Sequence, residues 1–285
     1  MVQQNNGIIG MVVDVSHLKT TSNYYPVLGA YDSCDAHVLA EHMQWISQSG
    51  AGVIITSWWG KGGFGDKCVK QIMVQANKHH IKVGFHIEPY GGRSGQSVAN
   101  DVNYINQNYG SHPAYFRDPG HGNKLAFYVF ADSTDVKDWS PIDHLRDHNI
   151  ILSQITDQSR FNHFNGFYNY AIGNHPKIVG IWKGMNDFCK VPNSKAAVLD
   201  RQNGTMYDNN WNWVFNSGIP NWVSITSFNE WHEGSMLEPA KFDQPAGHGY
   251  ITYQGAYHKT GKASEMAYIE TIKYWVNEYT KRSHH

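Results

Sequence analysis

The chain has 285 residues, a formal net charge of −1 at pH 7 and 16% charged residues, compared with about 25% in an ordinary soluble domain. It carries no basic patch and no Lys/Arg run, which makes nucleic acid and anionic membranes poor partners. Aromatic residues reach 14%, with 10 Trp and 17 Tyr. A sugar offers an apolar face to rings and hydroxyls to polar groups, so this composition favours a carbohydrate ligand.

Eight short apolar runs rich in β-forming residues recur along the chain. Most of them are nearly continuous hydrophobic stretches, which are typical of strands covered on both faces. The runs are Met11–Val15, Val53–Trp59, Val83–Pro89, Leu125–Asp132, Ile150–Thr156, Gly166–Ile172, Ile178–Met185 and Trp222–Trp231.

Helical patterns lie between several runs and after the last one. They are formed by Leu39, Met43 and Ile46 before Gly50, by Val69, Ile72, Met73 and Ala76, by Val102 and Ile105, and by Met266, Ile269, Ile272, Trp275, Val276 and Tyr279. We expect a long loop over Asp187–Asn210 that leads to a helix around Trp211–Phe215.

This alternation predicts an α/β protein with a single (β/α)₈ TIM barrel, in one domain over residues 1–285. Such a barrel needs about 250 residues, and the chain has enough. A doubly wound open sheet is the alternative, but no run is followed by the glycine fingerprint of dinucleotide-binding folds.

Polar and aromatic residues gather where the runs end. They are Ser57–Gly60, His86–Arg93, Ala131–Ser133, Tyr168, Tyr170, Glu230 and Glu233. Active sites of (β/α)₈ barrels are built at the carboxyl ends of the strands. The sequence therefore predicts a site on this rim.

The main catalytic candidates are Glu230 and Glu233, within Asn229–Gly234. Burial raises the pKa of a carboxyl group, and a neighbouring negative charge raises the pKa of one member of a pair further. One acid can then remain a proton donor while the other is an ionised base. The alternative is a solvated loop without a catalytic role, but the polar residues that several strands bring to one rim favour function.

Several of these segments resemble a known family. Ser227–Gly234, Ser57–Trp59 and His86–Tyr90 with Arg93 resemble the motifs of glycoside hydrolase family 99, the endo-acting α-1,2-mannosidases and mannanases. Tyr25–Tyr31, Tyr109–Tyr115 and Asn165–Tyr170 are similar to weaker segments of that family. The octapeptide Ser227–Gly234 is the most specific of these motifs.

The resemblance implies a retaining (β/α)₈ glycosidase that cleaves internal α-1,2-mannosidic bonds in an N-glycan arm or in α-mannan. By motif position, Glu230 is the base that removes the proton of the mannose 2-hydroxyl, and a 1,2-anhydro sugar forms. Glu233 is the general acid/base by the same transfer. No metal and no cofactor is implied, and the scattered histidines with no H-E-x-x-H pattern also argue against a metal.

The same resemblance implies a set of substrate contacts. They are Trp58, Trp59, His86, Glu88, Tyr90, Arg93, Tyr168, Asn229, Trp231 and His232. Trp58 or Trp59 would stack on a sugar ring, while core packing is the alternative for one of the two. An ion pair between Arg93 and Glu88 is the alternative for those residues. Asn229 and His232 alternatively orient the two glutamates or satisfy buried backbone groups. We expect Glu238 at the surface.

The sequence also bears on the location and the oligomeric state of the protein. No apolar run reaches the roughly 20 residues of a membrane span, and Met1–Val15 has no positive charge before its apolar part, so it is not a signal peptide as written. The resemblance nevertheless implies a secretory, periplasmic or extracellular enzyme. We expect a monomer.

Two segments depart from the family pattern. Gly10–Val15 lacks the Tyr/Trp-rich motif of the first strand, and Lys183–Asp187 replaces the turn after the seventh strand. These departures leave two alternatives open: a catalytically degenerate barrel that binds mannose-rich glycans, and a glycosidase of different sugar specificity.

Overall fold

The computed structural model describes residues 22–131, 136–154, 162–168, 179–182, 201–219, 222–231 and 234–283. Contacts divide the chain into two compact units. The central unit comprises the described residues from 52 to 168. The terminal unit comprises those from 22 to 51 and from 179 to 283. The expectation of one domain over the whole chain stays a prediction.

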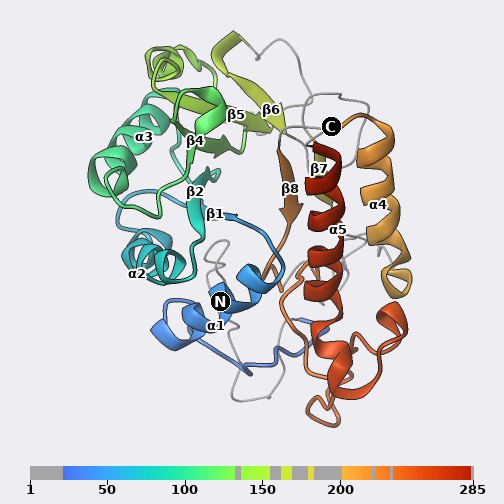
Figure 1. Ribbon diagram of the computed structural model, residues 1–285. Coiled ribbons are helices and arrows are strands. Elements are labelled where there is room, and N and C mark those ends of the chain that lie inside the picture. Colours follow the sequence, from blue (N-terminus) through green and yellow to red (C-terminus); the bar gives the residue numbers. More distant parts are fainter. Residues whose placement is uncertain are drawn as a thin grey trace. The chain divides into compact units, whose positions relative to one another are not determined.

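The central unit is built on a parallel sheet (Figure 1). The sheet has the order β1-β2-β4-β5-β6, and β3 pairs with β4 in the antiparallel direction. Its strands are β1 (Val53–Trp58), β2 (Lys82–Ile87), β3 (Arg117–Asp118), β4 (Lys124–Val129), β5 (Asn149–Gln154) and β6 (Gly166–Tyr168). Its helices are α2 (Phe64–Lys78), α3 (Gly95–Tyr109) and the 3₁₀ segments η1 (Pro119–His121) and η2 (Ser140–Leu145).

The register of this sheet brings the carboxyl ends of neighbouring strands to one edge. Trp58 at the end of β1 lies opposite Ile87 at the end of β2, and Ile87 lies opposite Val129 at the end of β4. Val129 in turn lies opposite Ser153 in β5. The segments that follow these strands therefore leave the sheet from the same edge, as the sequence predicts for a shared rim.

The terminal unit contains a second parallel pair of strands, β7 and β8. Helices α4 and α5 run side by side in this unit (Figure 1), and the Trp211 and Trp275 rings stack between them, 5.9 Å apart. Its elements are α1 (Ala36–Gln48), β7 (Val179–Trp182), η4 (Gln202–Gly204), α4 (Thr205–Asn216), β8 (Val223–Thr226), η5 (Ala256–His258), η6 (Gly261–Met266) and α5 (Ala267–Ser283).

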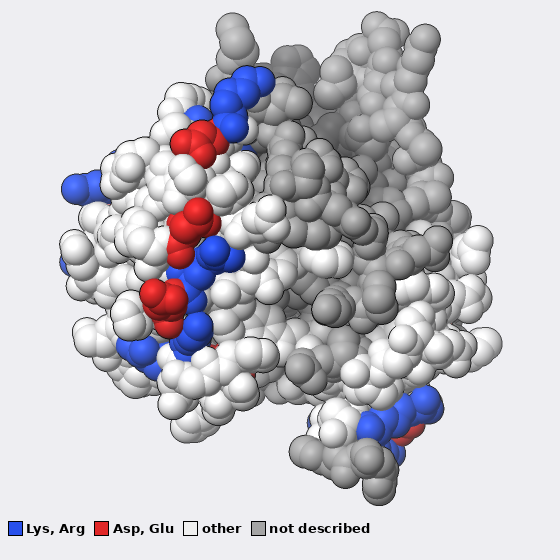
Figure 2. All heavy atoms as spheres, turned by 90° about the horizontal axis from the view of Figure 1, so that it is seen from above, with Lys and Arg blue, Asp and Glu red and all other residues white. Residues whose placement is uncertain are grey.

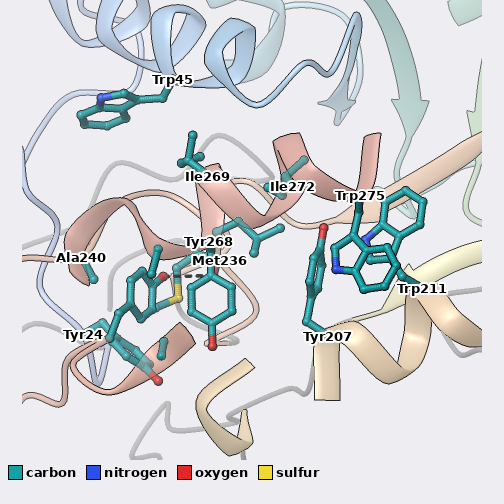
Figure 3. Close-up of a cluster of buried hydrophobic side chains, with 14 of the residues drawn as sticks. Tyr24, Trp45, Tyr207, Trp211, Met236, Ala240, Tyr268, Ile269, Ile272 and Trp275 are labelled. Atoms are coloured by element: carbon teal, nitrogen blue, oxygen red, sulfur yellow. Dashed lines mark hydrogen bonds between the residues drawn. The ribbon is translucent and has the colours of Figure 1, made fainter. Parts of the chain in front are cut away.

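An aromatic-rich cluster forms the core of the described part of the terminal unit. Tyr207, Trp211 and Trp275 gather beside α4 and α5 (Figure 3), and all three are buried. Trp231 and Met236, from the segment after β8, belong to the same cluster and have no exposed surface. The core therefore holds the segment that carries the predicted catalytic motif.

Most of the predicted elements are confirmed where the structure describes them. Seven of the eight apolar runs coincide with β1, β2 and β4 to β8, while Met11–Val15 lies outside the described residues. The last run extends to Trp231 in the sequence, but β8 ends at Thr226 because the chain turns from Ser227 onward. The expected loop to Asn210 is wrong at its end, since α4 begins at Thr205.

The described surface is mostly uncharged on the face that Figure 2 shows, and acidic and basic side chains alternate there. Among the described residues, no helix has the length and apolar character needed to cross a lipid bilayer.

The core of the terminal unit predicts a stability difference within α5. Ile272 is 5% exposed in the aromatic cluster, so Ile272→Ala should lower the free energy of unfolding by about 2–5 kcal/mol through lost burial and a residual cavity. Lys273 on the same helix is exposed, and Lys273→Ala should change the free energy of unfolding by no more than about 0.5 kcal/mol. Urea unfolding followed by circular dichroism measures both. Equal effects of the two substitutions would contradict the packing described.

Candidate active site

Three strands of the central unit contribute to one hydrogen-bonded network. The Nδ1 atom of His86 lies 2.7 Å from Oε1 of Glu88, and the Ser57 hydroxyl donates to the same oxygen over 2.7 Å. The other ring nitrogen of His86 hydrogen-bonds the hydroxyl of Tyr168. Ser57 lies on β1, His86 on β2 and Tyr168 on β6, so the sheet joins side chains that are far apart in the sequence.

This network orients Glu88. Its side chain is 13% exposed and that of His86 is 8% exposed, so their hydrogen bonds are largely protected from water. Within the described part of the chain, Glu88 is paired with His86 and Ser57, and no ion pair joins it to Arg93. The alternative of an Arg93–Glu88 pair is therefore wrong. The Arg93 guanidinium instead lies 5.8 Å from the centre of the Trp139 ring.

The structure separates the roles open to Trp58 and Trp59. Trp58 is fully buried and packs against Phe85 and Tyr104, with ring centroids 6.2 and 5.7 Å away. Trp59 keeps part of its surface exposed. Its buried indole N–H finds no hydrogen-bond acceptor among the described residues. Of the two rings, Trp59 is the one available for a ligand.

The Tyr90 hydroxyl is hydrogen-bonded to two side chains of helix α3. It donates to Asp101 and lies 2.9 Å from the Ser97 hydroxyl. Burial raises the pKa of Asp101 above its ordinary value, although the hydrogen bond from Tyr90 opposes that shift. Burial and the hydrogen bond to Asp101 also raise the pKa of Tyr90, which keeps the phenol neutral.

In the terminal unit, Glu230 lies four residues beyond the end of β8, in a turn that serine hydroxyls organise. The backbone N–H of Glu230 donates to the Ser227 hydroxyl over 3.1 Å. The Ser227 and Ser235 hydroxyls are hydrogen-bonded to each other at 2.8 Å. The Glu230 side chain is half-buried. The other predicted acid, Glu233, and its neighbour His232 lie outside the described residues.

The expectation of a surface position for Glu238 is wrong, because this residue is fully buried. Its Oε2 atom accepts hydrogen bonds from the Trp231 indole over 2.9 Å and from the Tyr31 hydroxyl over 2.7 Å. Its Oε1 atom lies 3.2 Å from Nε2 of His42 on α1. Trp231, a predicted substrate contact, thus belongs to a buried network, and Asn229, two residues earlier, is buried as well.

Arg201 is a second residue whose role the sequence did not indicate. Its guanidinium is buried and donates to the carbonyl oxygens of Gly234 and Met236 over 2.7 and 2.8 Å. Three tyrosine rings surround it, each about 5 Å from its central carbon: Tyr24, Tyr253 and Tyr268. A lone arginine before a helix carries no sequence pattern for such a position.

No set of three or more His, Cys, Asp or Glu side chains that could hold a metal ion occurs in the part of the chain that the structure describes. The groups that the structure brings together are instead carboxylates, hydroxyls, an imidazole and aromatic rings, the donor set that suits a neutral polyhydroxylated ligand.

Comparison with known proteins decides the family. The model of glycosyl hydrolase family 99 matches residues 8–146 and 157–281. The chain belongs to glycosyl hydrolase family 99. It is therefore a glycoside hydrolase, and the resemblance noted in the sequence is confirmed.

Individual relatives agree with the family. The chain is 30% identical over 306 residues to a glycoprotein endo-α-1,2-mannosidase-like protein of Danio rerio, covering 91% of this chain and 67% of that protein. It is 29% identical over 309 residues to the glycoprotein endo-α-1,2-mannosidase of Rattus norvegicus, covering 91% and 64%. The chain thus spans about two thirds of the length of these relatives.

A solved structure supports the fold class. The family 99 endo-α-mannosidase of Bacteroides thetaiotaomicron, in complex with bis-tris propane, superposes with a TM-score of 0.81 at 28% identity, covering 93% of this chain and 91% of that one. The predicted (β/α)₈ barrel is therefore confirmed for this family 99 chain.

The buried position of Asp101 predicts a pH-dependent contribution to stability. Its folded pKa is raised above the unfolded value of about 3.9, so between the two values the folded state binds more protons than the unfolded state. The contribution of Asp101 is thus present below the unfolded pKa and is lost as the pH rises through the folded pKa. The stability of the native protein relative to Asp101→Asn should fall as the pH is raised from the unfolded pKa of about 3.9 through the raised folded pKa. Urea unfolding across that range measures it, and a constant or increasing difference would contradict the shift.

Proposed function

We propose that this glycoside hydrolase is an endo-acting, retaining enzyme that cleaves internal α-1,2-mannosidic bonds in an N-glycan arm or in α-mannan. Glu230 is the base for the 2-hydroxyl and Glu233 the general acid/base. The names of the relatives in fish and rat support the bond type. The half-buried position of Glu230 beyond the carboxyl end of β8 is the observation that carries the proposal, because barrel enzymes place their reacting groups there.

The first step closes a three-membered ring on the sugar. The Glu230 carboxylate removes the proton of the 2-hydroxyl, and that oxygen attacks the anomeric carbon. The bond to the leaving sugar breaks as protonated Glu233 gives its proton to the departing oxygen. In an α-mannoside the axial 2-oxygen is trans to the leaving group, so attack is in line. An alcohol is a weak acid, and its base must lie within hydrogen-bonding reach.

The second step opens the 1,2-anhydro sugar with water. The Glu233 carboxylate removes a proton from water, whose oxygen forms a bond to the anomeric carbon while the bond to the 2-oxygen breaks. Glu230 returns its proton to that oxygen. Two inversions give net retention, and both acids regain their starting protonation states. This route uses no covalent glycosyl-enzyme bond, unlike the usual retaining pair of carboxylates.

The central unit supplies the substrate contacts in this proposal. Glu88, oriented by His86 and Ser57, accepts hydrogen bonds from sugar hydroxyls. Tyr90 and Arg93 bind further hydroxyls, and Tyr168 faces the anomeric centre. Buried polar groups with fixed partners discriminate well between sugars, since a wrong hydroxyl pattern leaves them unpaired.

Replacement of either acid should abolish hydrolysis. Glu230→Gln and Glu233→Gln each remove a proton acceptor, and we expect kcat to fall by about 10²–10⁴-fold. The substrate is an α-1,2-linked manno-oligosaccharide, with product size and anomeric configuration followed by NMR. Glu41→Gln, on an exposed position of α1, is the matched control and should retain full activity.

The outcomes separate the proposal from its alternatives. Glycan binding by the native chain without any product indicates a degenerate barrel. Cleavage of a different α-linked sugar indicates another specificity. Full activity in both Glu230→Gln and Glu233→Gln would contradict the catalytic roles proposed for these two residues.

Trp59 should contribute to substrate affinity through its ring and its indole N–H. Trp59→Ala removes both and should raise KM about 10-fold, the size of a lost aromatic contact. Trp59→Phe keeps a ring and should raise KM by a smaller factor. Steady-state kinetics with the same oligosaccharide measures both. A KM for Trp59→Ala equal to that of the native enzyme would assign Trp59 to packing.

A further inference from the structure

Glu238 is the most deeply buried acidic side chain among the described residues, with no exposed surface. Its hydrogen bonds come from parts of the chain that are distant in sequence. Tyr31 is 207 residues away, and His42, on helix α1, is 196 residues away. Trp231 is seven residues away, next to Glu230. The carboxylate therefore ties the motif after β8 to the start of the terminal unit.

The backbone around Glu238 is attached to the same motif. The N–H groups of Leu237 and Glu238 both donate to the carbonyl oxygen of Phe228, over 2.9 and 2.8 Å. The Tyr253 hydroxyl donates to the Glu238 carbonyl over 3.1 Å. The segments on both sides of Glu230 are thus held, one through the Trp231 ring and the other through Phe228.

Stability alone does not account for a glutamate at this position. Burying an acidic side chain is costly, and a well-packed apolar residue of similar size is often as stabilising or more so. A directional group can nevertheless fix a neighbouring ring in one orientation, which an apolar contact cannot do. Burial, and then the nearby Glu238 carboxylate, hold the pKa of Tyr31 well above its ordinary value, so Tyr31 remains a neutral donor.

We infer that Glu238 is a positioning residue of this active site, fixing the Trp231 ring and with it the backbone that carries Glu230. The inference rests on the proposed function, in which Glu230 must lie within hydrogen-bonding reach of a sugar hydroxyl. Glu238 itself touches no substrate in this assignment. Its loss should therefore impair the chemical step more than substrate binding.

The hydrogen bonds that Glu238 accepts predict which substitution at this position retains its positioning role. In Glu238→Gln, the amide oxygen can replace Oε2 and accept from both Trp231 and Tyr31. The amide N–H₂ then faces His42, whose ring can offer an unprotonated Nε2 by changing its tautomer. In Glu238→Leu, Tyr31 loses its acceptor at this site and Trp231 keeps only its 3.1 Å hydrogen bond to the Tyr31 hydroxyl, although the side chain has a similar volume.

The test compares kcat and KM of Glu238→Leu, Glu238→Gln and the native enzyme on the manno-oligosaccharide. A substitution far from the reacting atoms that displaces a reacting group by about 1 Å can lower the rate about 100-fold. We expect a loss of kcat of that size in Glu238→Leu. KM should change by less than about 3-fold. The kcat of Glu238→Gln should stay within about 3-fold of the native value.

Glu265→Leu is the matched control. Glu265 is also a buried glutamate of the terminal unit, 8% exposed, and it accepts from the backbone N–H of Phe242, not from the motif after β8. This variant should lose stability without losing kcat. Thermal unfolding of all variants shows whether losses of stability and of activity run together.

Each outcome decides the inference. A kcat of Glu238→Leu close to that of Glu265→Leu, a loss through KM alone, or equal impairment of the glutamine and leucine variants overturns it. If the native chain hydrolyses no α-mannoside, the proposed function fails, and hydrogen exchange of the peptide around Glu230 then decides. Faster exchange in Glu238→Leu but not in Glu238→Gln supports positioning, and unchanged exchange refutes it.

Discussion

Parallel strand pairing is the constraint on which the rest of the structure depends. Because β1, β2 and β4 are paired in parallel with their ends aligned, the residues that follow them leave the sheet at one edge. That arrangement lets Ser57 and Glu88 share a hydrogen bond although 31 residues separate them. The pairing of β7 with β8 likewise fixes where the motif of Glu230 begins. The sheet does not perform chemistry, but it determines which side chains can meet.

Much of this fold could be predicted from the sequence because strand burial leaves a strong local pattern. The runs at Val53–Trp59 and Ile150–Thr156 are rich in hydrophobic residues, and their described parts hold β1 (Val53–Trp58) and most of β5 (Asn149–Gln154). Strand ends were less predictable. β8 stops at Thr226 although Phe228 and Trp231 continue the apolar character, because those rings pack against the terminal-unit core outside any strand.

The candidate site was predictable only in part, for a physical reason. A motif of neighbouring residues can be recognised in the sequence, and Glu230 and Glu233 were predicted as catalytic residues in this way. Glu238 lies in an unremarkable stretch, and its burial depends on Tyr31 and His42, about 200 residues away. Glutamate is rarely buried, so composition alone points to the surface. Only tertiary contacts reverse that expectation, and the same is true of the alternative roles of Trp58 and Trp59.

Arg201 is a buried cation of the terminal unit that tyrosine rings surround. Among the described residues no carboxylate pairs with its guanidinium, which instead lies among the faces of tyrosine rings such as Tyr24 and Tyr253. Ion pairs at a surface weaken as dissolved salt screens them, whereas a ring quadrupole acting on a buried cation is shielded from mobile ions. The anchoring of Gly234 and Met236 by Arg201 should therefore depend little on ionic strength.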